Sequence, residues 1–169
     1  LEVRLPNNFL SINDWTSKEH ENFLFLTDKV KEGNYDSILE NKNFALVFEK
    51  ASLRTRVSFE VAIKKLGGNA IYLSENDIGL GKRESVTHVA KNLNRWVDGI
   101  IARVYDHSTL INFTKNTNIN IINALSDLEH PCQALADIYT IYKKFGKLDN
   151  VNFCYIGDGN NVASSLSLI

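Results

Sequence analysis

The sequence of 169 residues contains no methionine, only two prolines and only two cysteines. Cys132 and Cys154 do not have Cys-x-x-Cys spacing, so the sequence indicates neither a disulfide framework nor a zinc site. A reducing, cytoplasmic setting is the simpler interpretation. Because the sequence begins without methionine, we expect its natural N-terminus to have been trimmed.

An excess of charge and a long apolar run are also missing. The formal net charge is −1, so a general attraction to nucleic acid or to an anionic membrane is not expected. No apolar run approaches the roughly 18 residues that a membrane span needs. The N-terminal residues do not show the basic-then-apolar pattern of a signal peptide.

Apolar segments of strand length alternate with segments of helix length along the chain. Strands are predicted at 44–48, 69–73, 99–105, 119–125 and 151–157, and helices at 16–33, 56–68, 86–97, 108–116 and 131–146. This alternation is typical of an α/β fold with a parallel sheet and helices on both faces. Residues 161–169 begin another helix that has no stop signal, so we expect the chain to be part of a longer protein.

Polar residues follow each predicted strand. The segments are 52–56, 79–85, Arg103, 126–133 and 157–161. In parallel sheets, ligands bind beyond the carboxyl ends of the strands. We therefore expect all five segments to lie at one edge of the sheet and to form the functional site.

Ser52, Arg54 and Thr55 stand where a strand turns into a helix. Unpaired backbone N–H groups at a helix start attract anions, and a guanidinium can bind a phosphate through two parallel hydrogen bonds. The alternative is that Ser52 only caps the helix and that both arginines are solvated. We expect Arg56 to form a structural ion pair.

Arg103 and His130 are the other candidates for contact with a ligand. Arg103 interrupts an apolar strand, where a buried guanidinium needs either a carboxylate partner or a ligand. A ligand is the favoured alternative. His130 opens a helix, with Gln133 three residues later, and could donate a hydrogen bond to a carbonyl oxygen. His130 could also be a cap residue without a ligand.

The remaining reactive residue types carry weaker signals. Cys132 has no second histidine nearby in the sequence to activate it, so a nucleophilic role is not favoured. His20, His88 and His107 are expected at the surface.

The segment "GDGNN" matches a dinucleotide-binding fingerprint only in part. Gly157 and Gly159 fit Gly-x-Gly, but Val162 takes the place of the third glycine. Asn160 and Asn161 are better interpreted as polar ligands or turn residues.

Four motifs in this order resemble the aspartate/ornithine carbamoyltransferase family. They are "SLRTR" (52–56), "ARVY" (102–105), "HPCQALAD" (130–137) and "GDGNN" (157–161), and the likeness is strongest to its ornithine branch. The resemblance implies a carbamoyl-phosphate-binding domain at 1–148, including a connecting helix at 131–146. It also implies that 149–169 form the first strand and helix start of an ornithine-binding domain, and that the protein assembles as trimers or multiples of trimers.

The resemblance also implies the roles of individual residues. The phosphate would be held by Ser52, Leu53 (through its backbone), Arg54 and Thr55. The carbamoyl oxygen would be polarised by Thr55, Arg103 and His130, the carbamoyl nitrogen would contact Gln133, and ornithine would contact Asn161. The implied reaction gives citrulline in arginine metabolism and needs no metal, cofactor or covalent intermediate.

The sequence departs from the family pattern at two places. Leu53 replaces a commoner threonine, and Gly79 stands where relatives often carry a side chain that reaches carbamoyl phosphate. Whether Lys82 or Arg83 takes over that contact stays open. The alternatives to ornithine carbamoylation are another amine acceptor (aspartate, putrescine or an acylated ornithine), a truncated anion-binding module, and a nucleotide-binding oxidoreductase.

Overall fold

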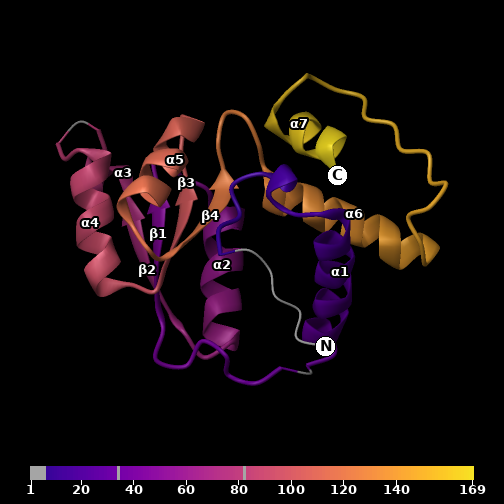
Figure 1. Cartoon of the computed structure of the whole chain (residues 1–169), viewed down its shortest axis with the longest axis horizontal. Coiled ribbons are helices and arrows are strands. Elements are labelled where there is room, and N and C mark those ends of the chain that lie inside the picture. Colours follow the sequence, from indigo (N-terminus) through magenta and orange to yellow (C-terminus); the bar gives the residue numbers. More distant parts are fainter. Residues whose placement is uncertain (1–6, 34, 82) are drawn as a thin grey trace.

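The computed structural model describes residues 7–33, 35–81 and 83–169, and these contain one parallel sheet (Figure 1). Its strands are β1 (Asn43–Phe48), β2 (Asn69–Ser74), β3 (Gly99–Arg103) and β4 (Asn120–Leu125), in the order β2-β1-β3-β4. Every neighbouring pair is parallel. The predicted α/β fold with a parallel sheet is confirmed.

Helices precede β1, connect the strands and follow β4. They are η1 (Ile12–Asp14), α1 (Ser17–Lys31), α2 (Leu53–Lys65), α3 (Glu75–Ile78), α4 (Val86–Trp96), α5 (His107–Asn116), α6 (Pro131–Phe145) and α7 (Asn161–Leu168). The predicted helices are present, and the short α3 lies between β2 and the polar segment 79–85. No helix in the described part of the chain has the length and apolar character needed to cross a membrane.

Helices cover both faces of the sheet, as predicted from the alternation of strands and helices in the sequence. Successive side chains of a strand point to opposite faces. In β1, Val47 packs into one cluster with residues of α4 and α5, such as Leu93 and Phe113. Leu46 packs into another cluster, which includes Ile63 of α2. Burial on both sides explains why the strands are continuous apolar runs rather than alternating ones.

The N-terminal segment and three helices pack beyond β4. The backbone N–H of Phe9 donates to Ile121 O at 2.9 Å, and the N–H of Asn123 donates to Phe9 O at 2.8 Å. Phe9 also packs with Trp15 and with Leu135 of α6. The segment around Phe9 thus covers the edge of β4 that no other strand pairs with. Figure 1 shows α1, α6 and α7 together on this side of the sheet.

The predicted strand at 151–157 is wrong. These residues form an extended, exposed connection between α6 and α7 (Figure 1). Ile156 is 92% exposed. A strand needs a neighbouring strand for its backbone hydrogen bonds, and no described strand pairs with this segment, so its apolar residues alone do not produce one.

A buried carboxylate joins three distant parts of the chain. Glu129, which precedes α6, accepts hydrogen bonds from the Ser11 hydroxyl, from the backbone N–H of Ile12 at 3.1 Å and from Ser165 Oγ of α7 at 3.0 Å. The Glu129 residue is only 6% exposed. Buried charge is tolerated where hydrogen bonds replace water, and Glu129 meets this condition.

We expect Glu129→Ala to lower the free energy of unfolding by at least about 2 kcal/mol, because it removes the acceptor of three donors, two of which are buried. Urea denaturation monitored by circular dichroism measures this change. Glu21→Ala is the matched control, since Glu21 forms an exposed pair with Lys18 and should contribute at most about 0.5 kcal/mol. Equal effects of the two substitutions would contradict the assigned role of Glu129.

Candidate functional site

A cleft of about 680 Å³ lies at the carboxyl end of the sheet. Its walls come from the first turns of α2, α6 and α7 and from the end of β3. The charged residues that line it are Arg54, Arg103 and Asp137. Since the N-terminal end of a helix carries a partial positive charge, three helix starts and two guanidiniums make this cleft suited to an anion.

Ser52 and Thr55 form the start of α2. Ser52 caps the helix, because its Oγ accepts from the backbone N–H of Thr55 at 3.4 Å. The Ser52 hydroxyl in turn donates to Thr55 Oγ1 at 3.0 Å. The first turn of α2 contains no acidic residue that would neutralise its positive end. The capping alternative is therefore correct for Ser52, and it leaves the end of the helix available to an anion.

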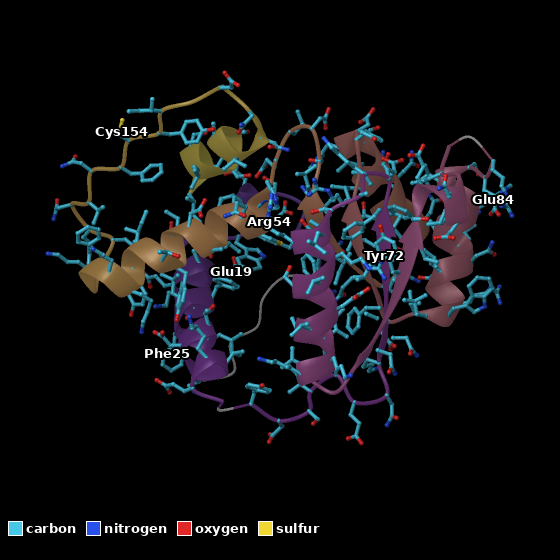
Figure 2. All side chains as sticks on the ribbon, turned by 180° about the vertical axis from the view of Figure 1, so that it is seen from behind. Glu19, Phe25, Arg54, Tyr72, Glu84 and Cys154 are labelled. Atoms are coloured by element: carbon cyan, nitrogen blue, oxygen red, sulfur yellow. The ribbon has the colours of Figure 1, made fainter. Side chains whose placement is uncertain are left out.

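The two arginines of α2 differ in their surroundings. Arg54 lines the cleft, and Figure 2 shows it at the end of α2 that faces α6. Arg56 donates from Nε to Glu60 Oε1 at 2.8 Å, and its guanidinium lies 3.7 Å from the ring centroid of Tyr72. The predicted structural ion pair of Arg56 is confirmed. The side chain of Leu53 is 80% exposed and lies outside the cleft, so only its backbone can contribute there.

Arg103 is half-buried at the end of β3 and contributes to the cleft. Its Nη1 donates to Thr55 Oγ1 at 3.3 Å. Its Nε is buried and has no hydrogen-bond partner among the described residues, and no carboxylate of that part of the chain forms an ion pair with it. Burial lowers the pKa of Arg103. Of the two alternatives for Arg103, the absence of a carboxylate partner here favours a ligand.

Thr55 links these groups. A hydroxyl has one proton and can accept two hydrogen bonds. Thr55 Oγ1 accepts from Ser52 Oγ and from Arg103 Nη1, so its own proton is left for a third group. The cleft therefore offers Thr55 as a donor.

His130 is the residue before α6, and its backbone is fixed by α7. The N–H of His130 lies 3.0 Å from Ser165 Oγ and 3.3 Å from Asn161 O. Its ring Nδ1 is buried without a partner among the described residues. Burial and the positive charge of Arg103 lower the pKa of His130 to about 4, and Asp137 partly opposes this change. His130 is therefore neutral at pH 7 and can donate from one ring nitrogen.

Two amide side chains complete the set of sequence candidates. Gln133 donates from Nε2 to Asp137 Oδ1 at 2.9 Å. Asn161 donates from Nδ2 to Ser126 O at 2.7 Å, which ties the start of α7 to the loop after β4. Both amides line the cleft, and neither carbonyl oxygen accepts a hydrogen bond from the part of the chain that the structure describes.

Cys132 also borders the cleft, but burial raises the pKa of its thiol to about 12. A protonated thiol is a poor nucleophile, which agrees with the interpretation from sequence. Both cysteines are free.

The expected exposure of the other histidines is correct only for His88. His20 is half-buried, because its ring packs 5.7 Å from that of Trp15, and desolvation lowers its pKa. His107 is half-buried too, with Nδ1 2.9 Å from Ser126 Oγ.

The described residues of the segment 79–85 do not reach this cleft. It follows β2, which is the edge strand farthest from β4, so it lies at the carboxyl end of the sheet but away from α6 (Figure 1). Gly79 has φ +58°, and a Cβ there would lie 2.8 Å from Arg83 Cβ, because the chain folds back at this point. Arg83 does not line the cleft, and Lys82 lies outside the described residues.

The segment 157–161 reaches the cleft only at its end. Asn161 lines the cleft, whereas Asn160 caps α7 by accepting from the N–H of Val162 at 3.0 Å. A dinucleotide fingerprint requires a strand before its glycines, and none is present at 151–157. This absence disfavours the oxidoreductase alternative.

Sequence reasoning missed Asp137, Glu129 and Ser165. Asp137 follows Gln133 by four residues on a helix, and that spacing could have indicated a contact. Glu129 and Ser165 meet only because α7 folds against α6, and no local pattern predicts this. No group of three His, Cys, Asp or Glu within 7–33, 35–81 and 83–169 could hold a metal ion.

Comparisons with known proteins show which family this chain resembles in sequence. The family model described as "Aspartate/ornithine carbamoyltransferase, carbamoyl-P binding domain" matches residues 7–143. An ornithine carbamoyltransferase of Methanocorpusculum labreanum is 46% identical over 166 residues, which are 96% of this chain and 54% of the relative. The chain thus spans about half the length of the curated relatives it matches.

Solved structures of carbamoyltransferases also superpose on this chain. Ornithine carbamoyltransferase from Thermus thermophilus superposes with a TM-score of 0.91 at 44% identity, covering 96% of this chain and 57% of that one. An N-acetyl-L-ornithine transcarbamylase mutant, complexed with carbamyl phosphate and N-succinyl-L-norvaline, has a TM-score of 0.77 at 32% identity. It covers 86% of this chain and 50% of that one.

The protonation of His130 can be measured by NMR. We expect its ring signals to titrate with a midpoint near pH 4, because burial and Arg103 both disfavour the charged form. Arg103→Gln should move the midpoint upward but keep it below 6.5, since burial remains. A midpoint at or above 6.5 in the unsubstituted protein would contradict a neutral His130.

Proposed function

Because the chain belongs to the aspartate/ornithine carbamoyltransferase family, we propose that it forms the carbamoyl-phosphate half of an ornithine carbamoyltransferase. The reaction transfers the carbamoyl group of carbamoyl phosphate to the δ-amine of L-ornithine and gives L-citrulline and phosphate. The active protein is proposed to be a trimer or a multiple of trimers. We place it in the cytoplasm, a setting with which two free cysteines agree.

One observation carries the proposal. Arg103 Nε and His130 Nδ1 are buried polar atoms without partners among the described residues, on two side chains that border one cleft. A buried polar atom without a hydrogen-bond partner is unfavourable, so such groups indicate a bound partner. Carbamoyl phosphate offers a carbonyl oxygen and an anionic phosphate to Arg103 and to the ring nitrogen from which neutral His130 donates.

The phosphate is proposed to bind at the start of α2. Ser52, Arg54 and Thr55 line that end of the cleft, and the backbone N–H groups of the first turn, including that of Leu53, have no helical partners. Charged hydrogen bonds to phosphate contribute about 1.5–3 kcal/mol each. Several of them together can hold a small dianion.

The carbamoyl group is proposed to lie between Arg103 and His130. The neutral δ-amine attacks the carbonyl carbon, a C–N bond forms, and negative charge develops on the carbonyl oxygen. Thr55, Arg103 and neutral His130 donate hydrogen bonds to that oxygen, which stabilises the transition state. The C–O bond to phosphate then breaks, phosphate leaves with the bonding electrons, and it takes up the proton that the amine nitrogen loses.

Gln133 and Asn161 are proposed to orient the two substrates. Gln133 contacts the carbamoyl nitrogen, and Asn161 contacts ornithine at the start of α7. Ornithine is favoured over an acylated ornithine because similarity to the ornithine enzymes is higher, at 46% and 44% identity against 32%.

The activity is tested by measuring phosphate release from carbamoyl phosphate by the full-length gene product, with and without L-ornithine. We expect release that depends on ornithine, with citrulline formed in equal amount. Release with aspartate, putrescine or N-acetylornithine instead would reassign the acceptor. Binding of carbamoyl phosphate without turnover of any amine would favour a non-catalytic binding module.

We expect Arg54→Ala to weaken carbamoyl-phosphate binding at least about tenfold, through loss of a charged hydrogen bond. Isothermal titration calorimetry without an amine acceptor measures the dissociation constant. Arg56→Ala is the matched control, because Arg56 pairs with Glu60 outside the cleft, and its affinity should stay within about twofold. Equal affinities of the two variants would contradict the proposed contact between Arg54 and the phosphate.

A further inference from the structure

The Gln133–Asp137 hydrogen bond fixes one of two orientations of the Gln133 amide. A primary amide presents a carbonyl oxygen on one side and an NH₂ group on the other, and rotation by 180° exchanges them. Asp137 as a carboxylate can only accept, so the NH₂ group must face it, as the 2.9 Å contact from Nε2 to Oδ1 shows. The Gln133 carbonyl oxygen is thereby left for another donor.

That orientation matters because of the chemistry of the proposed substrate. The carbamoyl nitrogen of carbamoyl phosphate carries two N–H donors, and its lone pair is delocalised into the carbonyl group, so it accepts poorly. A Gln133 amide turned the other way would set two donors against each other. Only the orientation that Asp137 selects lets Gln133 offer the carbamoyl nitrogen an acceptor.

The charge of Asp137 supports a role of this kind. The other charged residues that line the cleft are Arg54 and Arg103, and an anion is expected to bind between them. A carboxylate in the same cleft repels phosphate, so Asp137 acts against anion binding. Its one hydrogen bond to a described residue is to Gln133. The same bond polarises the amide and makes the Gln133 oxygen a stronger acceptor.

We propose that Asp137 is a positioning residue that holds the carbonyl oxygen of Gln133 toward the carbamoyl nitrogen. Through Gln133, it allows the site to distinguish carbamoyl phosphate from acyl phosphates that lack N–H groups. This inference rests on the proposed function. It adds to that function the residue that makes the cleft selective for a carbamoyl group.

The test compares carbamoyl phosphate with acetyl phosphate, in which a methyl group replaces the NH₂ group. Calorimetric titration of the full-length gene product gives the ratio of the two dissociation constants. Asp137→Ala removes a charge that repels both anions equally, so this effect cancels in the ratio. We expect the preference for carbamoyl phosphate to fall about three- to tenfold, because the Gln133 side chain must then be ordered on binding. Asp137→Asn keeps the shape but permits both amide orientations, and should give a smaller loss of about twofold.

The same substitution in a Gln133→Ala background completes the test. If Asp137 acts through Gln133, Asp137→Ala should change the ratio less than about twofold there. An equal loss of preference in both backgrounds would overturn the inference in favour of a direct contact between Asp137 and the carbamoyl nitrogen. Weakening of both ligands by the same factor would overturn it in favour of a purely structural role. Failure of the unsubstituted protein to bind either phosphate would instead reject the proposed function, before any variant is compared.

Discussion

The parallel arrangement of the strands is the constraint on which the site depends. A parallel strand must be followed by a crossover that returns to the other end of the sheet, so its helix begins where the strand has ended. β1 therefore delivers the start of α2, and β4 delivers the start of α6, to the same edge as Arg103 of β3. The strand connections therefore bring the N-terminal ends of these helices to one edge of the sheet. Their partial positive charge attracts anions there, and the side chains add to this attraction.

The strand order then decides which polar segments can cooperate. β1, β3 and β4 are consecutive neighbours, and the residues that follow them share the cleft. β2 is the edge strand farthest from β4. The described residues of the segment 79–85 therefore lie at the carboxyl end of the sheet but away from the cleft. Its turn at Gly79 closes on Arg83 rather than extending toward α6. A common edge is therefore necessary for a shared site, but it is not sufficient.

The sequence predicts the strands and most helices because burial on both sides leaves continuous apolar runs, which are visible without a structure. It also predicts most of the polar residues that line the cleft, since strand ends and helix starts are local features. The segment 151–157 has the same apolar character and is not a strand, because pairing with a neighbour is not local. The same limit applies to Glu129 and Ser165, which lie far apart in sequence and meet only in the folded chain. The contact between Asp137 and Gln133 could have been predicted, because residues four apart on a helix are neighbours.

The roles proposed for Thr55, Arg103 and His130 rest on what each group can contribute. Arg103 brings a permanent charge, which is half-buried and forms no ion pair with a carboxylate of the described residues. A second charge on His130 would repel it, and burial already disfavours that charge, so the imidazole stays neutral and acts as a hydrogen-bond donor. Thr55 uses both of its acceptor positions on Ser52 and Arg103, which directs its remaining proton to a third group. The side chains of Thr55 and Arg103 are thus oriented by their mutual contact, and the backbone of His130 is held by α7, before any substrate binds. Such preorganisation is what stabilises charge that develops during a reaction, because no further ordering is needed at that moment.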